Sequence, residues 1–146
     1  MQVPHNSLVL VADGKKMLFF RNQGDSEYPN LQVESAEEHQ DLRSREQRTD
    51  AAGQASSPQG QSRSAIEQTD FQQLEEDRFA AHAAELLKKR ALANDFENLI
   101  IVAPPKTLGE LRKHYHLEVE QRLNGELAKD LTSHPVDQIE KLIIAA

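Results

Sequence analysis

Basic side chains outnumber acidic ones by three to one within residues 98–116, although the whole chain carries a net charge of −7. Lys106 stands just before the predicted start of a helix, where backbone N–H groups already favour an anion. The candidate contacts for a phosphate, free or within RNA, are Lys106, Thr107, Arg112 and Lys113. The alternative is a charged surface whose only effect is to keep the protein in solution.

An apolar run and a proline pair set the local structure around these candidates. Leu99–Val102 is continuously apolar, which is typical of a strand covered on both faces. Pro104 and Pro105 cannot donate to a sheet ladder, so the strand is expected to end before them. Thr107 and Glu110 have the spacing of a helix capping box. Because ligands of α/β sheets bind beyond the carboxyl ends of strands, we expect a site here; the alternative is a plain connection between strand and helix.

The sequence lacks the usual signatures of catalysis and of metal binding. There is no cysteine, which excludes disulfides, thiolate nucleophiles and cysteine-ligated metals. There is also no P-loop, no GxGxxG, no GxSxG and no HExxH. His114 and His116 are two residues apart, so on a helix they would face different sides and do not predict a shared metal ion. We therefore expect no cofactor and no metal, and an ordinary hydrolase is not supported.

Two apolar runs near the N-terminus predict a β-hairpin. Leu8–Ala12 and Met17–Arg21 flank Asp13 and Gly14, and Asp-Gly between such runs is a strong turn signal. Asp13 is therefore expected to serve the turn, with a functional carboxylate as the alternative. Leu31–Ser35 predicts a third strand, which would complete a short antiparallel meander.

Composition changes abruptly in residues 36–70. This stretch contains one leucine, one isoleucine and no aromatic residue. Such a chain cannot bury enough apolar surface to offset the entropy that it loses on ordering. We expect a long disordered insertion, and loops of this length are usually either functional or linkers.

The second half of the chain alternates helix and strand patterns. Helices are predicted over Asp70–Asn94, Leu108–Glu118 and Val136–Ile143, and a strand over Arg122–Ala128. Together with the hairpin, this order predicts one α/β domain over residues 1–146. Its mixed β-sheet would have an N-terminal antiparallel meander and helices on both faces.

No segment of the sequence has the pattern of a membrane span or of an export signal. The N-terminal apolar run, Leu8–Ala12, is short, and no stretch approaches about 20 apolar residues. The negative net charge argues against a general affinity for nucleic acid. We therefore expect a cytoplasmic protein with no membrane partner and no DNA partner.

Three blocks of the sequence resemble a known family. They are LVLVADGKKMLFFRN near the N-terminus, FENLIIVAPPKTLGELRK in the middle and ELAKDLTSHPVDQIEKL near the C-terminus. Together they resemble the bacterial host attachment protein family, described as proteins required for attachment to host cells. That family is in turn similar to bacterial relatives of the archaeo-eukaryotic class 1 peptide release factors, through the middle domain of the release factor. The resemblance covers nearly the whole chain outside residues 36–70.

The resemblance implies a further candidate within the insertion. In the release factor, a long mobile loop carries a Gly-Gly-Gln that promotes hydrolysis of peptidyl-tRNA. The corresponding residues here include Gly53-Gln54 and Gly60-Gln61 but no Gly-Gly-Gln. Gln61, preceded by Gly60, is the catalytic candidate that the resemblance supplies. The alternative is a chance Gly-Gln in a glutamine-rich stretch.

Three functions follow as alternatives. The first is a non-enzymatic module that binds the ribosome or tRNA through Lys106, Arg112, Lys113 and the loop over residues 36–70. It follows from the local positive charge together with the resemblance to a release factor. The second is a protein-interaction factor that is needed indirectly for attachment to host cells and binds its partner through residues 36–70. The third is a peptidyl-tRNA hydrolase that uses Gln61.

Overall fold

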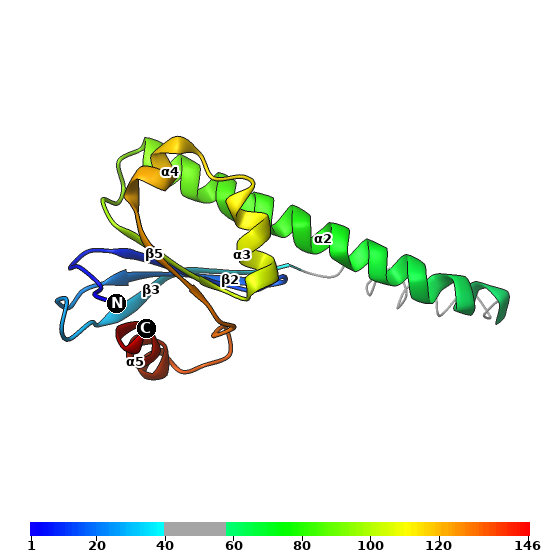
Figure 1. Ribbon diagram of the computed structural model, residues 1–146, viewed down its shortest axis with the longest axis horizontal. Coiled ribbons are helices and arrows are strands. Elements are labelled where there is room, and N and C mark those ends of the chain that lie inside the picture. Colours follow the sequence, from blue (N-terminus) through cyan, green and yellow to red (C-terminus); the bar gives the residue numbers. More distant parts are fainter. Residues whose placement is uncertain (40–57) are drawn as a thin grey trace.

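The computed structural model describes residues 1–39 and 58–146, with the side chains of 1–39 and 69–146 (Figure 1). The strands are β1 (Leu8–Ala12), β2 (Lys16–Asn22), β3 (Leu31–Glu38), β4 (Leu99–Ala103) and β5 (Leu123–Ala128). The helices are α2 (Pro58–Leu92), α3 (Pro105–Arg112), α4 (Leu117–Arg122) and α5 (Val136–Ala145). The sheet has the order β3-β2-β1-β4-β5, antiparallel from β3 to β1 and parallel from β1 to β5. The predicted mixed sheet with its antiparallel meander is therefore confirmed.

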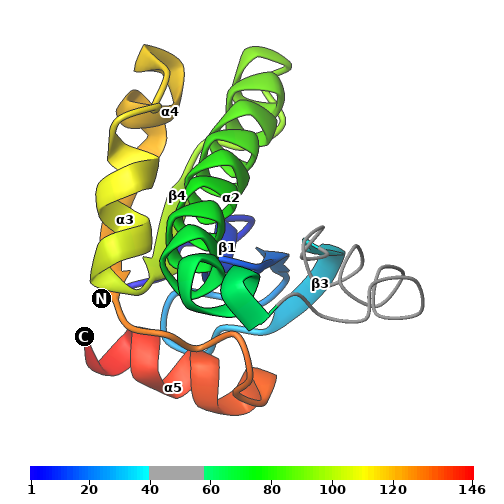
Figure 2. The ribbon, with the colours of Figure 1, turned by 90° about the vertical axis from the view of Figure 1, so that its right-hand side faces the viewer.

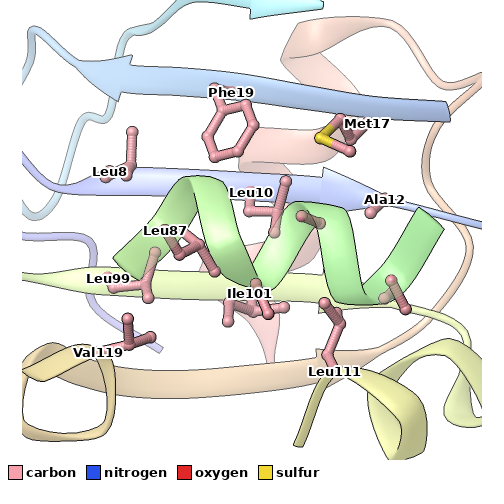
Figure 3. Close-up of a cluster of buried hydrophobic side chains, with 14 of the residues drawn as sticks. Leu8, Leu10, Ala12, Met17, Phe19, Leu87, Leu99, Ile101, Leu111 and Val119 are labelled. Carbon is pink, nitrogen blue, oxygen red and sulfur yellow. The ribbon is translucent and has the colours of Figure 1, made fainter. Parts of the chain in front are cut away.

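Helices form a layer on each face of the sheet. One face is covered by α2, α3 and α4, and α5 lies on the other (Figure 2). On the first face, Leu10 and Ile101 pack beneath Leu87 of α2 (Figure 3). On the second, Val11 packs with Ile139 of α5. Because successive strand residues point to opposite faces, β1 and β4 are buried at every position, and this explains their continuous apolar sequences.

Helix α2 begins earlier than the sequence predicts. It starts at Pro58, so Asp70 lies inside the helix and the prediction that the helix starts at Asp70 is wrong. The C-terminal part of α2 packs on the sheet, where Phe79 and Leu87 are buried. The N-terminal part projects beyond the sheet (Figure 1). The sequence of this part contains glutamine, glutamate and arginine, whose intrinsic propensities favour a helix.

Both ends of the predicted insertion over residues 36–70 belong to regular secondary structure. Residues 36–38 continue β3, because they pair with β2 as far as the Lys16–Glu38 partners. Residues 58–70 belong to α2. Residues 40–57 lie outside the described part of the chain.

Two helix boundaries after β4 also differ from the predictions. Helix α3 begins at Pro105, so Thr107 lies inside it and the predicted capping box at Thr107 is wrong. Proline is favoured at the first helical position because it has no N–H group to leave unpaired. The predicted helix over residues 108–118 is interrupted after Arg112, and α4 begins at Leu117. The N-cap of α4 is His116, whose Nδ1 accepts a hydrogen bond from a backbone N–H at 3.0 Å.

A buried arginine joins β2 to three other segments. Arg21 lies on the α2 face of β2, and its side chain is 6% exposed. It donates from Nε to Oε2 of Glu34 on β3 and from Nη2 to Oδ2 of Asp95 before β4, both at 3.1 Å. Arg90 of α2 bonds the same two carboxylates and lies over the ring of Phe19. Two guanidinium groups and two carboxylates thus compensate one another where β2, β3 and α2 meet.

The carboxylates of this network are held in their charged form. Glu34 is the extra residue of a β-bulge between β2 and β3. Burial alone would raise the pKa of Glu34, but hydrogen bonds from Arg90 and Arg21 outweigh burial and lower it. Burial alone would also raise the pKa of Asp95, but Arg90 and Arg21 outweigh burial and lower it.

Acid should weaken the fold through these two carboxylates. The pKa values of Glu34 and Asp95 are lower in the folded chain than the ordinary values of 4.5 and 3.8. The two charged carboxylates therefore stabilise the fold at any pH above these ordinary values. This stabilisation is lost as the pH falls through the folded values. At pH 7 we expect Glu34→Gln to lower the free energy of unfolding by about 1–2 kcal/mol, allowing for its partial exposure, and to flatten the decline below about pH 5.

Urea titrations between pH 3 and pH 7 measure this effect. The matched control is Glu38→Gln, on the same strand, because Glu38 is exposed and has no ion pair among the residues whose side chains are described. An equal loss of stability in both variants would contradict a specific role for Glu34.

Candidate functional site

The carboxyl ends of the three parallel strands form one edge of the sheet. Val11 of β1 pairs with Val102 of β4, and Ala103 of β4 pairs with Ala128 of β5. In Figure 3, Ala12 marks this end of β1. The segments that follow the strands therefore leave the sheet as neighbours. We call them together the carboxyl edge: residues 13–16 of the hairpin turn, 104–107 at the start of α3, and 129–135 before α5.

Asp13 serves the hairpin turn and also binds a distant loop. Its Oδ1 accepts hydrogen bonds from the N–H groups of Lys15 at 2.8 Å and Lys16 at 2.7 Å. Its Oδ2 accepts a hydrogen bond from the Thr132 hydroxyl at 2.9 Å, and the same hydroxyl lies 3.0 Å from Oδ1 of Asp130. A hydroxyl has one proton, so the two carboxylates share it. This contact ties the loop before α5 to the hairpin turn.

The contribution of Thr132 and Asp130 was not foreseen from the sequence. Residues 132–133 have the composition of helix caps, and the sequence offers that local explanation for them. The hydrogen bond between Thr132 and Asp13 joins residues that are 119 positions apart in the sequence, so no local pattern predicts it.

Gly14 lies on the α2 side of the turn. A Cβ at this position would lie 2.7 Å from Cγ of Glu76, so a larger residue would require the Glu76 side chain to move. A water-sized pocket between the turn and α2 is lined by Gly14, Lys15, His39, Gln72, Glu75 and Glu76. The pocket is too small for a nucleotide or another organic ligand.

Lys106 and Thr107 lie at the carboxyl edge, at the start of α3. Lys106 is exposed and has no ion-pair partner among the described side chains. The N–H groups of Lys106 and Thr107 belong to the first helical turn, whose donors have no partner within the helix. The first intrahelical bond is donated by Leu108, to the Pro104 carbonyl at 2.9 Å. An exposed ammonium group and two backbone donors therefore lie together here.

Arg112 and Lys113 lie at the other end of α3, and both bind carboxylates. Arg112 donates from Nη2 and Nε to Oε1 of Glu126 on β5, at 2.8 and 3.1 Å. Lys113 donates to Glu110 at 2.7 Å. These ion pairs remain partly exposed, with 55% of the Arg112 side chain and 66% of the Lys113 side chain accessible. The structure thus separates Lys106 and Thr107 from the other two predicted anion contacts.

Tyr115 completes the cluster around Glu126. Its hydroxyl donates to Oε2 of Glu126 at 2.8 Å. Burial, together with this hydrogen bond to a carboxylate, raises the pKa of Tyr115 far above its usual range, so the phenol stays protonated and keeps donating. Glu126 therefore accepts hydrogen bonds from both a phenol and a guanidinium group, and it holds α3 against β5.

Gly60 and Gln61 are the third and fourth residues of α2. They occupy the end of the helix that projects from the sheet (Figure 1). Their side chains are outside the described part of the structure, as are Gly53 and Gln54 altogether. The structure therefore does not bring Gln61 to the carboxyl edge.

Among the described residues, no group of three or more histidine, aspartate or glutamate side chains is arranged to hold a metal ion. The described helices also include none with the length and apolar character needed to cross a membrane.

Comparison with known proteins places the chain in a family. Residues 6–143 match the model of bacterial archaeo-eukaryotic release factor family 12. An uncharacterised protein of Rickettsia prowazekii (strain Madrid E) is 33% identical over 79 residues, which are 53% of this chain and 53% of that protein. The chain thus matches about half the length of this curated relative.

The match confirms the resemblance to release factors that the sequence blocks indicate. The matching family model does not mention attachment to host cells, so the resemblance to the host attachment family stays a prediction. With 138 of the 146 residues inside the match, the chain belongs to bacterial archaeo-eukaryotic release factor family 12, and a translation-related role is supported at the level of that family.

Proposed function

We propose that this protein is a non-enzymatic module that contacts ribosomal RNA or tRNA through its carboxyl edge, with Lys106 as the principal anion contact. The translation-related family supports this proposal. The observation that carries it is the exposed Lys106 beside the free N–H groups of the first turn of α3. Lysine side chains and helix N-termini both bind phosphate oxygens, and such contacts supply affinity without reading the base sequence.

Arg112 and Lys113 are secondary contacts in this proposal. A phosphate that approaches them has to compete with Glu126 and Glu110. Water screens exposed ion pairs, so the competition reduces the contribution of these two residues without abolishing it.

Reversing the charge at Lys106 should weaken binding to ribosomes. We expect Lys106→Glu to reduce co-sedimentation at low salt and to lower the slope of log affinity against log salt by about one, because one phosphate contact is lost. The matched control is Lys141→Glu, which makes the same charge change at an exposed position of α5 on the opposite face. If the wild type does not sediment with ribosomes, or both variants lose binding equally, the proposal is wrong.

Removing the competitor of Arg112 should have the opposite effect. Glu126→Gln frees the guanidinium group of Arg112, and the glutamine carbonyl can still accept the hydrogen bond from Tyr115. We expect binding to strengthen about two- to threefold, in line with the small energy of an exposed ion pair. The control is Glu120→Gln, an exposed carboxylate of α4 with no ion pair in the described part of the chain. An equal gain in both variants would reflect net charge alone.

Hydrolysis of peptidyl-tRNA is a second candidate function. It is supported by the position of Gly60 and Gln61 in the first turn of α2, at its projecting end (Figure 1). A Gly-Gln at the end of a projecting helix is an arrangement that suits a long reach to a substrate. This function would assign the role of catalytic residue to Gln61.

A release assay on peptidyl-tRNA separates the two functions. We expect no release of peptide by the wild type, by Gln61→Ala or by Gln54→Ala, which alters the other Gly-Gln. Release by the wild type that is lost in Gln61→Ala but retained in Gln54→Ala would establish the hydrolase and refute the non-enzymatic module.

A further inference from the structure

The end of β3 is attached to α2 by two pairs of histidine and carboxylate. His39 Nε2 lies 2.9 Å from Oε2 of Glu75, and His82 Nε2 lies 2.8 Å from Oε1 of Glu37. In the first pair the strand side supplies the histidine, and in the second the helix supplies it. The His39 ring also lies against Phe79 of α2, with 5.5 Å between ring centroids.

The two pairs differ in burial. The side chain of Glu75 is 7% exposed, and its other oxygen accepts a hydrogen bond from Arg78 at 2.9 Å. The pair of His82 and Glu37 is about half exposed on both sides. A buried carboxylate gains more from a neighbouring positive charge than an exposed one, because water screens the exposed pair. The charge state of His39 therefore matters more than that of His82.

We propose that these four side chains form a proton-dependent clasp that holds the end of β3 on α2. A neutral histidine can only donate a hydrogen bond to its carboxylate, whereas a protonated histidine also forms an ion pair with it. Histidine changes charge between about pH 5 and pH 8. The clasp therefore tightens toward pH 5.5 and loosens toward pH 8. This device stands independently of any contact with RNA.

Other charged groups around the clasp do not cancel this dependence. Near His39, the cations are Arg78, Lys15 and Lys16, and the anions besides Glu75 are Glu76 and Glu38. Near His82, α2 itself places Arg78 one turn before and Glu85 one turn after. With Glu75 included, three cations stand against three anions around His39. Around His82, Arg78 stands against Glu85. The carboxylate that each histidine contacts directly, at 2.9 and 2.8 Å, therefore decides the sign.

Hydrogen exchange at the end of β3 tests the clasp. The N–H of His39 donates to the Lys15 carbonyl at 2.6 Å, so it exchanges with solvent only when the end of β3 opens. The measurement is the NMR protection factor of this amide in the full chain, which corrects for the intrinsic effect of pH on exchange. We expect protection to be about three- to tenfold greater at pH 5.5 than at pH 8.0, as two partly exposed ion pairs imply.

Three variants decide the origin of the effect. The double variant His39→Gln and His82→Gln keeps a hydrogen-bond donor at each position but cannot be protonated, so its protection should not change with pH. His82→Gln alone alters only the half-exposed pair and should keep most of the dependence on pH. His134→Gln removes an exposed histidine of the carboxyl edge and should behave as the wild type.

The same protection in the wild type at both pH values would overturn the clasp. So would a double variant that responds to pH as the wild type does, because another group would then be titrating. Far-UV circular dichroism at both pH values confirms that each variant is folded, which assigns any loss of protection to the end of β3.

Discussion

A buried guanidinium group stays charged, so its burial is costly unless carboxylates and carbonyl oxygens compensate it, and the side chain of Arg21 is 6% exposed. This requirement links parts of the chain that are far apart in sequence. Glu34 comes from a bulge in β3, Asp95 from the turn before β4, and Arg90 from the last turns of α2. The position of α2 over the sheet and the start of β4 thus depend on the same electrostatic compensation.

The candidate site depends on the direction of the strands that this arrangement supports. Because β1, β4 and β5 are parallel, a turn, a helix start and a loop all emerge at one edge. The hydrogen bonds of Asp13 fix the turn and the loop to each other there. Lys106 is left exposed at the same edge, whereas Arg112 is already paired with Glu126. The distribution of cations that an anion would meet is therefore set by tertiary pairing and cannot be read from a count of basic residues.

Local signals in the sequence predicted what local physics controls. The apolar run Leu99–Val102 and the Asp-Gly turn at residues 13–14 indicated the buried strand and the hairpin correctly. The start of α3 was misplaced because the capping pattern at Thr107 was preferred over the proline at the first helical position. The pairs Arg112–Glu126 and Asp13–Thr132 were not predicted, because they join residues on different elements. Lys106 and Thr107 lie near the carboxyl end of β4, as the sequence predicts, but they belong to the first turn of α3 and do not precede it.

The projecting part of α2 converts a small change in its angle into a large displacement of its N-terminal end. From Glu75, where the end of β3 touches the helix, to Pro58 the axis extends for about 26 Å. Tilting such a rod by about 10° about Glu75 would carry its tip roughly 4–5 Å, more than the length of a hydrogen bond. The position in which residues 58–61 meet a partner therefore depends on the angle at which α2 leaves the sheet. A modest change of packing where β3 ends would act over this distance without any rearrangement of the core.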